Sequence, residues 1–179
     1  MKLLKNIFVW IFAILLTATV LIYQRMTGPT YPKRVSIEVE GQEMKFRLLR
    51  SWQKEKVPDK MSHVPLVNVG DLDLEGYEFE CKYKRNNTAD DWTMIDMYRE
   101  GEEVVAVVPT QPPAGKLAYV IRMKKGDASY TLTEEPVVIR FKDYIPGWVP
   151  PPHVLLIFIA LLFSTMTAVE ALRGGRHVL

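Results

Sequence analysis

The sequence predicts an antiparallel β-sandwich inserted between two transmembrane α-helices, and three observations support this fold class. Uncharged apolar segments stand near both ends of the 179-residue chain. Between them, short runs alternate apolar and polar residues, as half-buried strands do. Turn-forming residues separate these runs at intervals of roughly ten residues, which is typical of all-β domains.

The first apolar segment, 6–24, is predicted to be transmembrane helix 1, after a cytoplasmic N-terminus over 1–5. All 19 of its residues are uncharged, and about 20 helical residues cross a bilayer core. Trp10 and Tyr23 are the expected interfacial anchors, because amphipathic aromatic rings favour the headgroup level. A cleaved signal peptide is the alternative, but the length of the segment and the lack of a small-x-small cleavage site favour a retained anchor.

Proline-rich connectors are predicted on both sides of the central domain, as a stalk over 25–33 and a connector over 144–152. Proline fixes φ and disfavours helix, so these segments are expected to be extended, semi-rigid spacers. Tyr144 and Trp148 are further candidate anchors, which would hold the domain close to the lipid surface.

The β-sandwich domain, 34–143, is predicted to hold seven to nine strands. The clearest pattern is Tyr77–Lys84, in which two tyrosines, Phe79 and Cys81 share one face and four charged residues share the other. Weaker patterns predict strands at Val35–Val39, Met44–Leu49, Val64–Val69, Trp92–Tyr98, Val104–Val108, Leu117–Met123, Tyr130–Leu132 and Val137–Phe141. A hairpin turn is expected at 40–42, and the charged tract 52–63 is expected to be a solvated loop.

The last apolar segment, 153–172, is predicted to be transmembrane helix 2, followed by a cytoplasmic tail over 173–179. Its stretch 155–163 is apolar on every face, whereas a surface helix would show a polar stripe. Two spans place both termini on one side of the membrane. The lysines and arginines at the two ends favour the cytoplasm for that side, so the central domain would be periplasmic or extracellular and the membrane the cell (inner) membrane.

Helix 2 also carries the candidate contact residues. Ala160, Ser164 and Ala168 recur every four residues, and such a small-xxx-small stripe lets another helix approach closely. Because Ala13 and Thr17 repeat the spacing in helix 1, the stripe predicts one of two arrangements. The two helices of one chain pack through it, or it contacts a membrane protein partner or a second copy of the chain.

Glu170 is the one acidic residue within the second span, and intramembrane ionisable groups are functional candidates by default. It stands three residues before Arg173. Two readings remain open, namely a boundary residue paired with that arginine and an intramembrane contact with a partner.

One stretch of the domain resembles a known family. It contains Trp92-Thr93-Met94-Ile95-Asp96-Met97, then Val107-Val108-Pro109, then Gly115-Lys116-Leu117-Ala118-Tyr119-Val120-Ile121. With this order, residues 77–141 resemble the immunoglobulin-like or fibronectin type III-like modules of bacterial envelope proteins. The resemblance implies such a sandwich, with Trp92 in its core, within a bacterial membrane-anchored protein. It implies no activity.

Catalytic and metal chemistry find little support. Cys81 is the only cysteine, so an intrachain disulfide is excluded and a buried core thiol is expected. His63, His153 and His177 are far apart in a two-span chain. The sequence contains three acidic pairs, Asp90-Asp91, Glu102-Glu103 and Glu134-Glu135. They are expected to be solvated turn residues. No catalytic or nucleotide-binding motif is present, so we expect no enzyme, cofactor or metal.

The charge distribution argues against nucleic acid as a partner. Residues 24–152 hold 19 of the 23 Lys and Arg and 20 of the 21 Asp and Glu, which gives a formal net charge of −1. The bilayer and a membrane protein are the partners that the sequence favours.

The leading functional hypothesis is therefore a non-enzymatic accessory or interaction subunit of a cell-envelope complex. One alternative is a membrane-anchored cell-wall or carbohydrate-binding module, for which exposed aromatic rings would supply stacking surfaces. The candidates are Trp52, Trp92, Tyr98 and Tyr130. The other is a subunit that contributes Glu170, together with His153, to a membrane enzyme or transporter.

Overall fold

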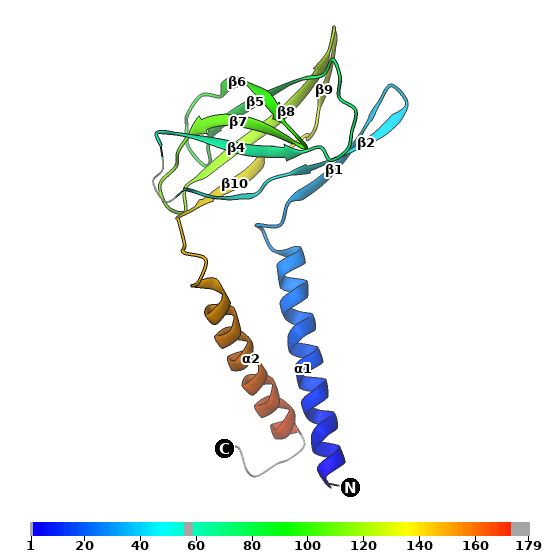
Figure 1. Ribbon diagram of the computed structural model, residues 1–179, viewed down its shortest axis with the longest axis vertical. Coiled ribbons are helices and arrows are strands. Elements are labelled where there is room, and N and C mark those ends of the chain that lie inside the picture. The colour runs from blue at the N-terminus through cyan, green and yellow to red at the C-terminus, as the bar shows by residue number, and fades with distance from the viewer. Residues whose placement is uncertain (1, 56–58, 173–179) are drawn as a thin grey trace. The chain divides into compact units, whose positions relative to one another are not determined.

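The computed structural model describes residues 2–55 and 59–172, with side chains from residue 7 onward. The chain divides into two compact units. One contains the two helices, and the other, Pro29–Tyr144, contains the strands (Figure 1). The predicted tail 173–179 lies outside the described residues, as does the centre of the tract 52–63.

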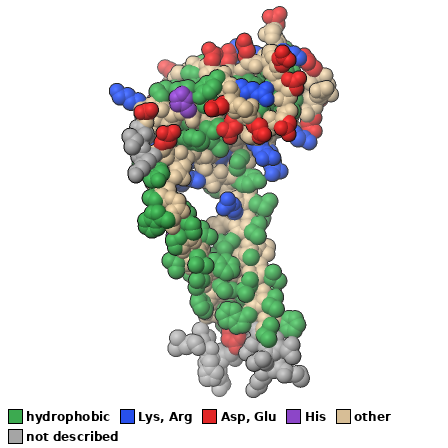
Figure 2. All heavy atoms as spheres, viewed as in Figure 1, with side chains coloured by type: hydrophobic (Ala, Val, Ile, Leu, Met, Phe, Trp, Pro, Cys, Tyr) green, Lys and Arg blue, Asp and Glu red, His purple; other side chains and the backbone are tan. Residues whose placement is uncertain are grey.

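The helices are α1 (Lys2–Thr27) and α2 (Pro150–Leu172). Within them, Ile7–Thr27 and all of α2 are long and apolar enough to cross a membrane. Hydrophobic side chains cover both helices (Figure 2), and no residue of α2 is buried. A core helix of a soluble protein would be largely buried, so exposed apolar surface of this extent indicates association with a bilayer.

Both helices extend into the segments expected as connectors. The helix α1 continues to Thr27, and α2 begins with Pro150, Pro151 and Pro152. Prolines are accepted there because the N–H groups of a first helical turn have no partner within the helix. The segment between α1 and the first strand forms bends and a turn rather than an extended spacer.

Ten strands form the sheet in the described part of the chain. They are β1 (Lys33–Val39), β2 (Gln42–Leu48), β3 (Ser51–Gln53), β4 (Met61–Asn68), β5 (Glu78–Arg85), β6 (Thr93–Glu100), β7 (Glu103–Pro109), β8 (Lys116–Lys125), β9 (Ala128–Thr131) and β10 (Val137–Lys142). Nine of them confirm strands predicted from the residue pattern. The exception is β3, which lies in the tract expected to be a loop.

The predicted immunoglobulin-like sandwich is wrong, and so is the all-β class. The architecture is mixed, with two long helices and one strongly curled half-barrel sheet in the order β1-β2-β4-β7-β6-β5-β8-β10-β3, with β9 beside β8. The strand β6 joins the two halves, because it pairs with β5 through Thr93–Met97 and with β7 through Tyr98–Glu100. Hydrogen bonding is therefore continuous where a sandwich would have two separate sheets.

Irregularity in β4 contributes to the curl. Its pairing with β7 shifts register between Pro65 and Val67, and such bulges bend a strand and increase its twist. At the far end of the sheet, β3 pairs with β10 in parallel, whereas the other pairs are antiparallel.

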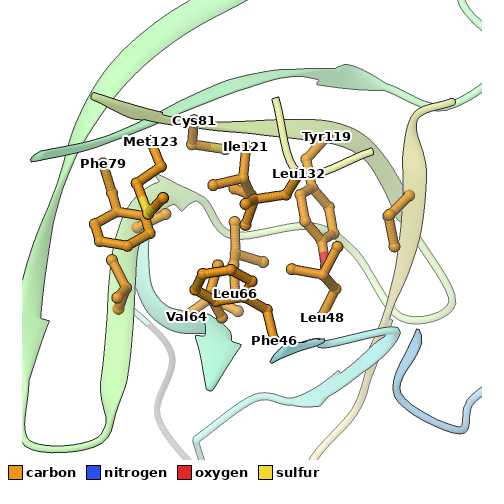
Figure 3. Close-up of a cluster of buried hydrophobic side chains, with 14 of the residues drawn as sticks. Phe46, Leu48, Val64, Leu66, Phe79, Cys81, Tyr119, Ile121, Met123 and Leu132 are labelled. Atoms are coloured by element: carbon orange, nitrogen blue, oxygen red, sulfur yellow. The ribbon is translucent and has the colours of Figure 1, made fainter. Parts of the chain in front are cut away.

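The core fills the concave side of the curled sheet (Figure 3). Phe46, Leu48, Val64 and Leu66 come from β2 and β4, and they face side chains of β5 and β8 across the interior. The facing residues include Cys81, Tyr119, Ile121 and Met123. Tyr119 reaches across this core, and its hydroxyl donates a hydrogen bond of 2.7 Å to the carbonyl oxygen of Leu49. Both halves of the sheet thus share one core.

The β1–β2 hairpin has the turn that its sequence predicts. Val39 pairs with Gln42, so Glu40 and Gly41 form a two-residue loop with φ of 52° and 80°. Positive φ at both positions is required by the hairpin turn whose twist matches that of the strands.

The tract expected to be a solvated loop is more ordered than predicted. The side chain of Lys54 is only 7% exposed, and its Nζ lies 3.1 Å from a carboxylate oxygen of Asp143. The backbone N–H of Lys54 also bonds the carbonyl oxygen of Lys142 at 3.0 Å. These contacts fix the chain after β3 against the end of β10.

Candidate functional site

The contact between the two helices uses small residues of α1. Ala13 and Thr17 are buried, at 0% and 3% exposure, where α1 meets α2. The hydroxyls of Thr17 and Thr165 lie 3.3 Å apart. Because Thr165 donates its proton to the carbonyl oxygen of Leu161 at 2.9 Å, Thr17 is the donor between the helices. The pair is therefore joined by close packing and one interhelical hydrogen bond.

The stripe of small residues on α2 lies outside this contact. Ala160, Ser164 and Ala168 are all exposed. Six positions of α2 are half-buried. One is Glu170, near the end of the helix, and the other five mark the face toward α1, namely Phe158, Leu162, Thr165, Met166 and Val169. At 3.6 residues per turn, the centre of the stripe is about 140° from the centre of that face. Of the two predicted arrangements, packing of the stripe against the chain's own α1 is not the one observed.

The four predicted interfacial anchors are exposed side chains. Trp10 and Tyr23 lie in α1, while Tyr144 and Trp148 lie between β10 and α2. Exposure is a requirement for contact with headgroups, and their role as anchors stays a prediction.

Glu170 is half-buried, two residues before the end of α2. Its predicted partner Arg173 lies outside the described residues, so the choice between a boundary residue and a partner contact stays open. His153, the other residue of the enzyme or transporter hypothesis, is exposed in the first turns of α2.

The prediction of a buried core thiol is confirmed for Cys81. Its side chain is fully buried in β5. Burial raises the pKa of this thiol to about 12, because the surroundings disfavour the charged thiolate. Cys81 is therefore part of the packing and is not activated as a nucleophile.

The aromatic residues of the carbohydrate hypothesis do not form one stacking surface in the described chain. Trp52 and Tyr130 pack against the core. Trp92, expected in the core, instead lies half-buried beside β6, with the Nζ atoms of Lys82 and Lys84 at 5.3 and 5.2 Å from its ring centroid. Six residues, roughly 20 Å of strand, separate Trp92 from Tyr98.

Tyr98 is engaged with a histidine. Its hydroxyl lies 2.8 Å from Nδ1 of His63, and the two rings meet edge to face. The adjoining pocket, lined by Trp52 and His63 among others, has a volume of about 50 Å³. Ligand pockets usually measure about 300–1,000 Å³, so this one is too small for a sugar ring.

Among the acidic pairs, Asp90 has a structural partner. Arg85 donates two hydrogen bonds to its carboxylate, from Nε at 2.5 Å and from Nη2 at 2.8 Å. The hydrogen bond from Arg85 lowers the pKa of Asp90 to about 2. Within the described residues, no group of three or more His, Cys, Asp or Glu side chains is arranged to hold a metal ion.

The residue patterns predicted none of the pockets that the described residues form, and one of these pockets gathers several cationic side chains. It lies where β2 separates from β4, since these strands pair only through Arg47–Asn68 and Leu48–Val67. This hairpin pocket has a volume of about 480 Å³, and its polar lining consists of Arg34, Ser36, Lys45, Arg47, Asn68 and Gly70. The hairpin turn held a usable signal, because it sets the register that places Arg34 opposite Arg47.

Comparisons with known proteins add no identity. No protein family model, curated protein or solved structure matches the chain.

Proposed function

We propose that this chain is a non-enzymatic integral membrane protein whose α2 helix binds a helix of a membrane partner, so that the chain acts as an accessory or interaction subunit of a cell-envelope complex. The observation that carries the proposal is the exposure of Ala160, Ser164 and Ala168 on a face of α2 that does not contact α1.

The chemistry of this face favours a second helix over lipid alone. In a bilayer, helices associate by close packing and hydrogen bonding, because lipid tails are as apolar as the helix surface. Small side chains allow two backbones to approach, and the Ser164 hydroxyl can bond across the contact. The Ala13–Thr17 face of α1 has the same combination of small side chains and a hydroxyl group, and it contacts α2 within the chain.

The proposed orientation places both termini in the cytoplasm and the β-sheet domain on the periplasmic or extracellular side. The support is the lysines and arginines at the chain ends, together with the length of the central domain. Long domains are translocated with little regard to their charges.

The test is affinity purification of the tagged full chain from gently solubilised membranes, with quantitative mass spectrometry and sedimentation in the same detergent. Ser164→Leu places a bulky side chain in the middle of the small-residue stripe and should block close approach of a second helix, whereas Ser164→Ala keeps the residue small. Thr19→Leu is the matched control, because it adds the same side chain at an exposed position of the other span, on the far side of α1 from Thr17.

We expect Ser164→Leu to reduce the recovery of a specific partner, or self-association, by about tenfold, whereas Ser164→Ala and Thr19→Leu retain it. Loss of a partner protein from the Ser164→Leu variant identifies a heteromeric complex. A variant that sediments as a lighter species than the unmodified chain identifies a homo-oligomer. If Ser164→Leu recovers the same partners and the same mass as the unmodified chain, the proposed contact is refuted.

A further inference from the structure

The hairpin pocket concentrates positive charge in a domain that has little net charge. Its lining includes Arg34, Lys45 and Arg47 and no Asp or Glu, although residues 24–152 sum to −1. Arg34 and Arg47 are directly opposite each other on neighbouring strands. Side chains in such a pair point to the same face, and like charges there are destabilising unless an anion lies between them.

The two arginines have free hydrogen-bonding capacity. Among the described residues, neither forms an ion pair; Arg34 donates one hydrogen bond of 3.3 Å to the hydroxyl of Tyr31. Lys45 is partly neutralised, because its Nζ lies 3.2 Å from an oxygen of Glu43. The planar guanidinium groups are thus the cations available to an incoming anion, and guanidinium matches phosphate in a two-pronged geometry.

The neighbouring rows of the sheet define where an anion fits. Asn68 continues the row of Arg34 and Arg47 onto β4 and adds an amide donor. One row toward the hairpin turn, Ser36 is opposite Lys45, and beyond it Glu38 is opposite Glu43. The charge on the outer face therefore changes from positive at the pocket to negative at the turn. Such a gradient orients a phosphate toward the arginines.

The sequence ties this pocket to the membrane helix. Only residues 28–32 separate α1 from β1, and five residues span at most about 18 Å. The pocket is an open one of about 480 Å³, within the range of small-ligand sites. A phosphate group on the bilayer surface is therefore the anion most accessible to it.

We propose that the hairpin pocket binds the phosphate of an anionic phospholipid headgroup, held between Arg34 and Arg47. The proposal depends on the β-sheet domain being tethered to a bilayer, but not on a partner helix. The Ser164 variants therefore test the partner proposal separately, and either proposal can fail alone.

The experiment uses the full chain in a neutral detergent and measures bound lipid by native mass spectrometry. Phosphatidylglycerol is the anionic probe, and phosphatidylcholine has a phosphate but no net charge. The double variant Arg34→Ala/Arg47→Ala removes the two guanidinium groups. The control Lys116→Ala/Arg140→Ala removes two cations from another cross-strand pair, outside the pocket.

We expect the unmodified chain and the control to retain phosphatidylglycerol over phosphatidylcholine. The double variant should bind it at least about tenfold more weakly. Equal losses in both variants, or no preference in the unmodified chain, would overturn the proposal, because general charge attraction would then suffice. Arg34→Lys/Arg47→Lys, which keeps the charge, should fold without difficulty and bind with intermediate strength.

A second arm separates the lipid from a free anion. Inorganic phosphate and glycerol 3-phosphate are added as competitors at matched ionic strength. If neither displaces phosphatidylglycerol at a concentration equal to that of the lipid, the lipid assignment stands. If either displaces it fully, the pocket is a site for soluble phosphate compounds and the lipid assignment is wrong.

Discussion

Replacing Tyr119 by Phe tests whether the two halves of the curled sheet pack across one core as described. The Tyr119 hydroxyl is almost wholly buried and bonds the Leu49 carbonyl oxygen at 2.7 Å, across the core from β8 to the segment after β2. Its loss removes one neutral hydrogen bond, about 1 kcal/mol net, and leaves a partly buried carbonyl without that partner, which adds about 1 kcal/mol. We therefore expect the unfolding free energy to fall by about 2 kcal/mol.

The assay is urea unfolding of the full chain in detergent, followed by near-ultraviolet circular dichroism. With a slope of about 2 kcal/mol/M, the midpoint should fall by about 1 M. Tyr130→Phe is the matched control, because the Tyr130 hydroxyl forms no hydrogen bond in the described chain, and its effect should stay within about 0.5 kcal/mol. If both variants unfold at the same urea concentration, the Tyr119 bond does not hold the two halves of the sheet together.

Three further predictions concern single residues. Cys81 should resist maleimide at pH 8 until the protein unfolds, because a pKa of about 12 leaves roughly a thousandth of the usual thiolate. A variant with an exposed cysteine, Ser129→Cys, should react at once, and equal reaction rates for the two cysteines would contradict the buried position of Cys81. Asp90 should titrate near pH 2 by NMR, so its contribution to stability is present above about pH 4 and is lost as pH falls toward 2. Arg85→Gln should return the titration midpoint of Asp90 toward 3.8, and an unmoved midpoint would exclude the ion pair as the cause of the lowered pKa. Gly41→Val should destabilise the sheet by about 1–2 kcal/mol in thermal unfolding, because φ at this position is 80°, and Gly41→Asn should destabilise it less. Equal effects of the two substitutions would exclude the turn geometry as the cause.

The two proposed sites assign different roles to different parts of the chain. The stripe of α2 is proposed to bind another helix within the bilayer, and the hairpin pocket is proposed to bind a charged headgroup at the surface of that bilayer. Neither involves proton transfer or a nucleophile, in keeping with the proposal of a non-enzymatic protein. Each site has its own variant and control, so the results can be interpreted independently.

Local pattern by itself determined much of the secondary structure. Alternation along Tyr77–Lys84 correctly placed β5 and the buried Cys81, because side chains on a strand point to opposite faces in turn. The pair Glu40 and Gly41 correctly marked a hairpin, since few residues accept positive φ. The two apolar segments gave the helices, because length and composition decide whether a helix suits a bilayer.

Only the tertiary structure decided how these elements combine. Alternation shows which face of a strand is buried but does not name its neighbours, so a sandwich and a curled sheet share one pattern until β6 is seen to pair with both β5 and β7. The same limit applies to the sites. Whether Ser164 faces α1, and whether Arg34 and Arg47 meet Asn68 beside a pocket, depends on contacts between segments far apart in the sequence, and local periodicity carries no information about such contacts.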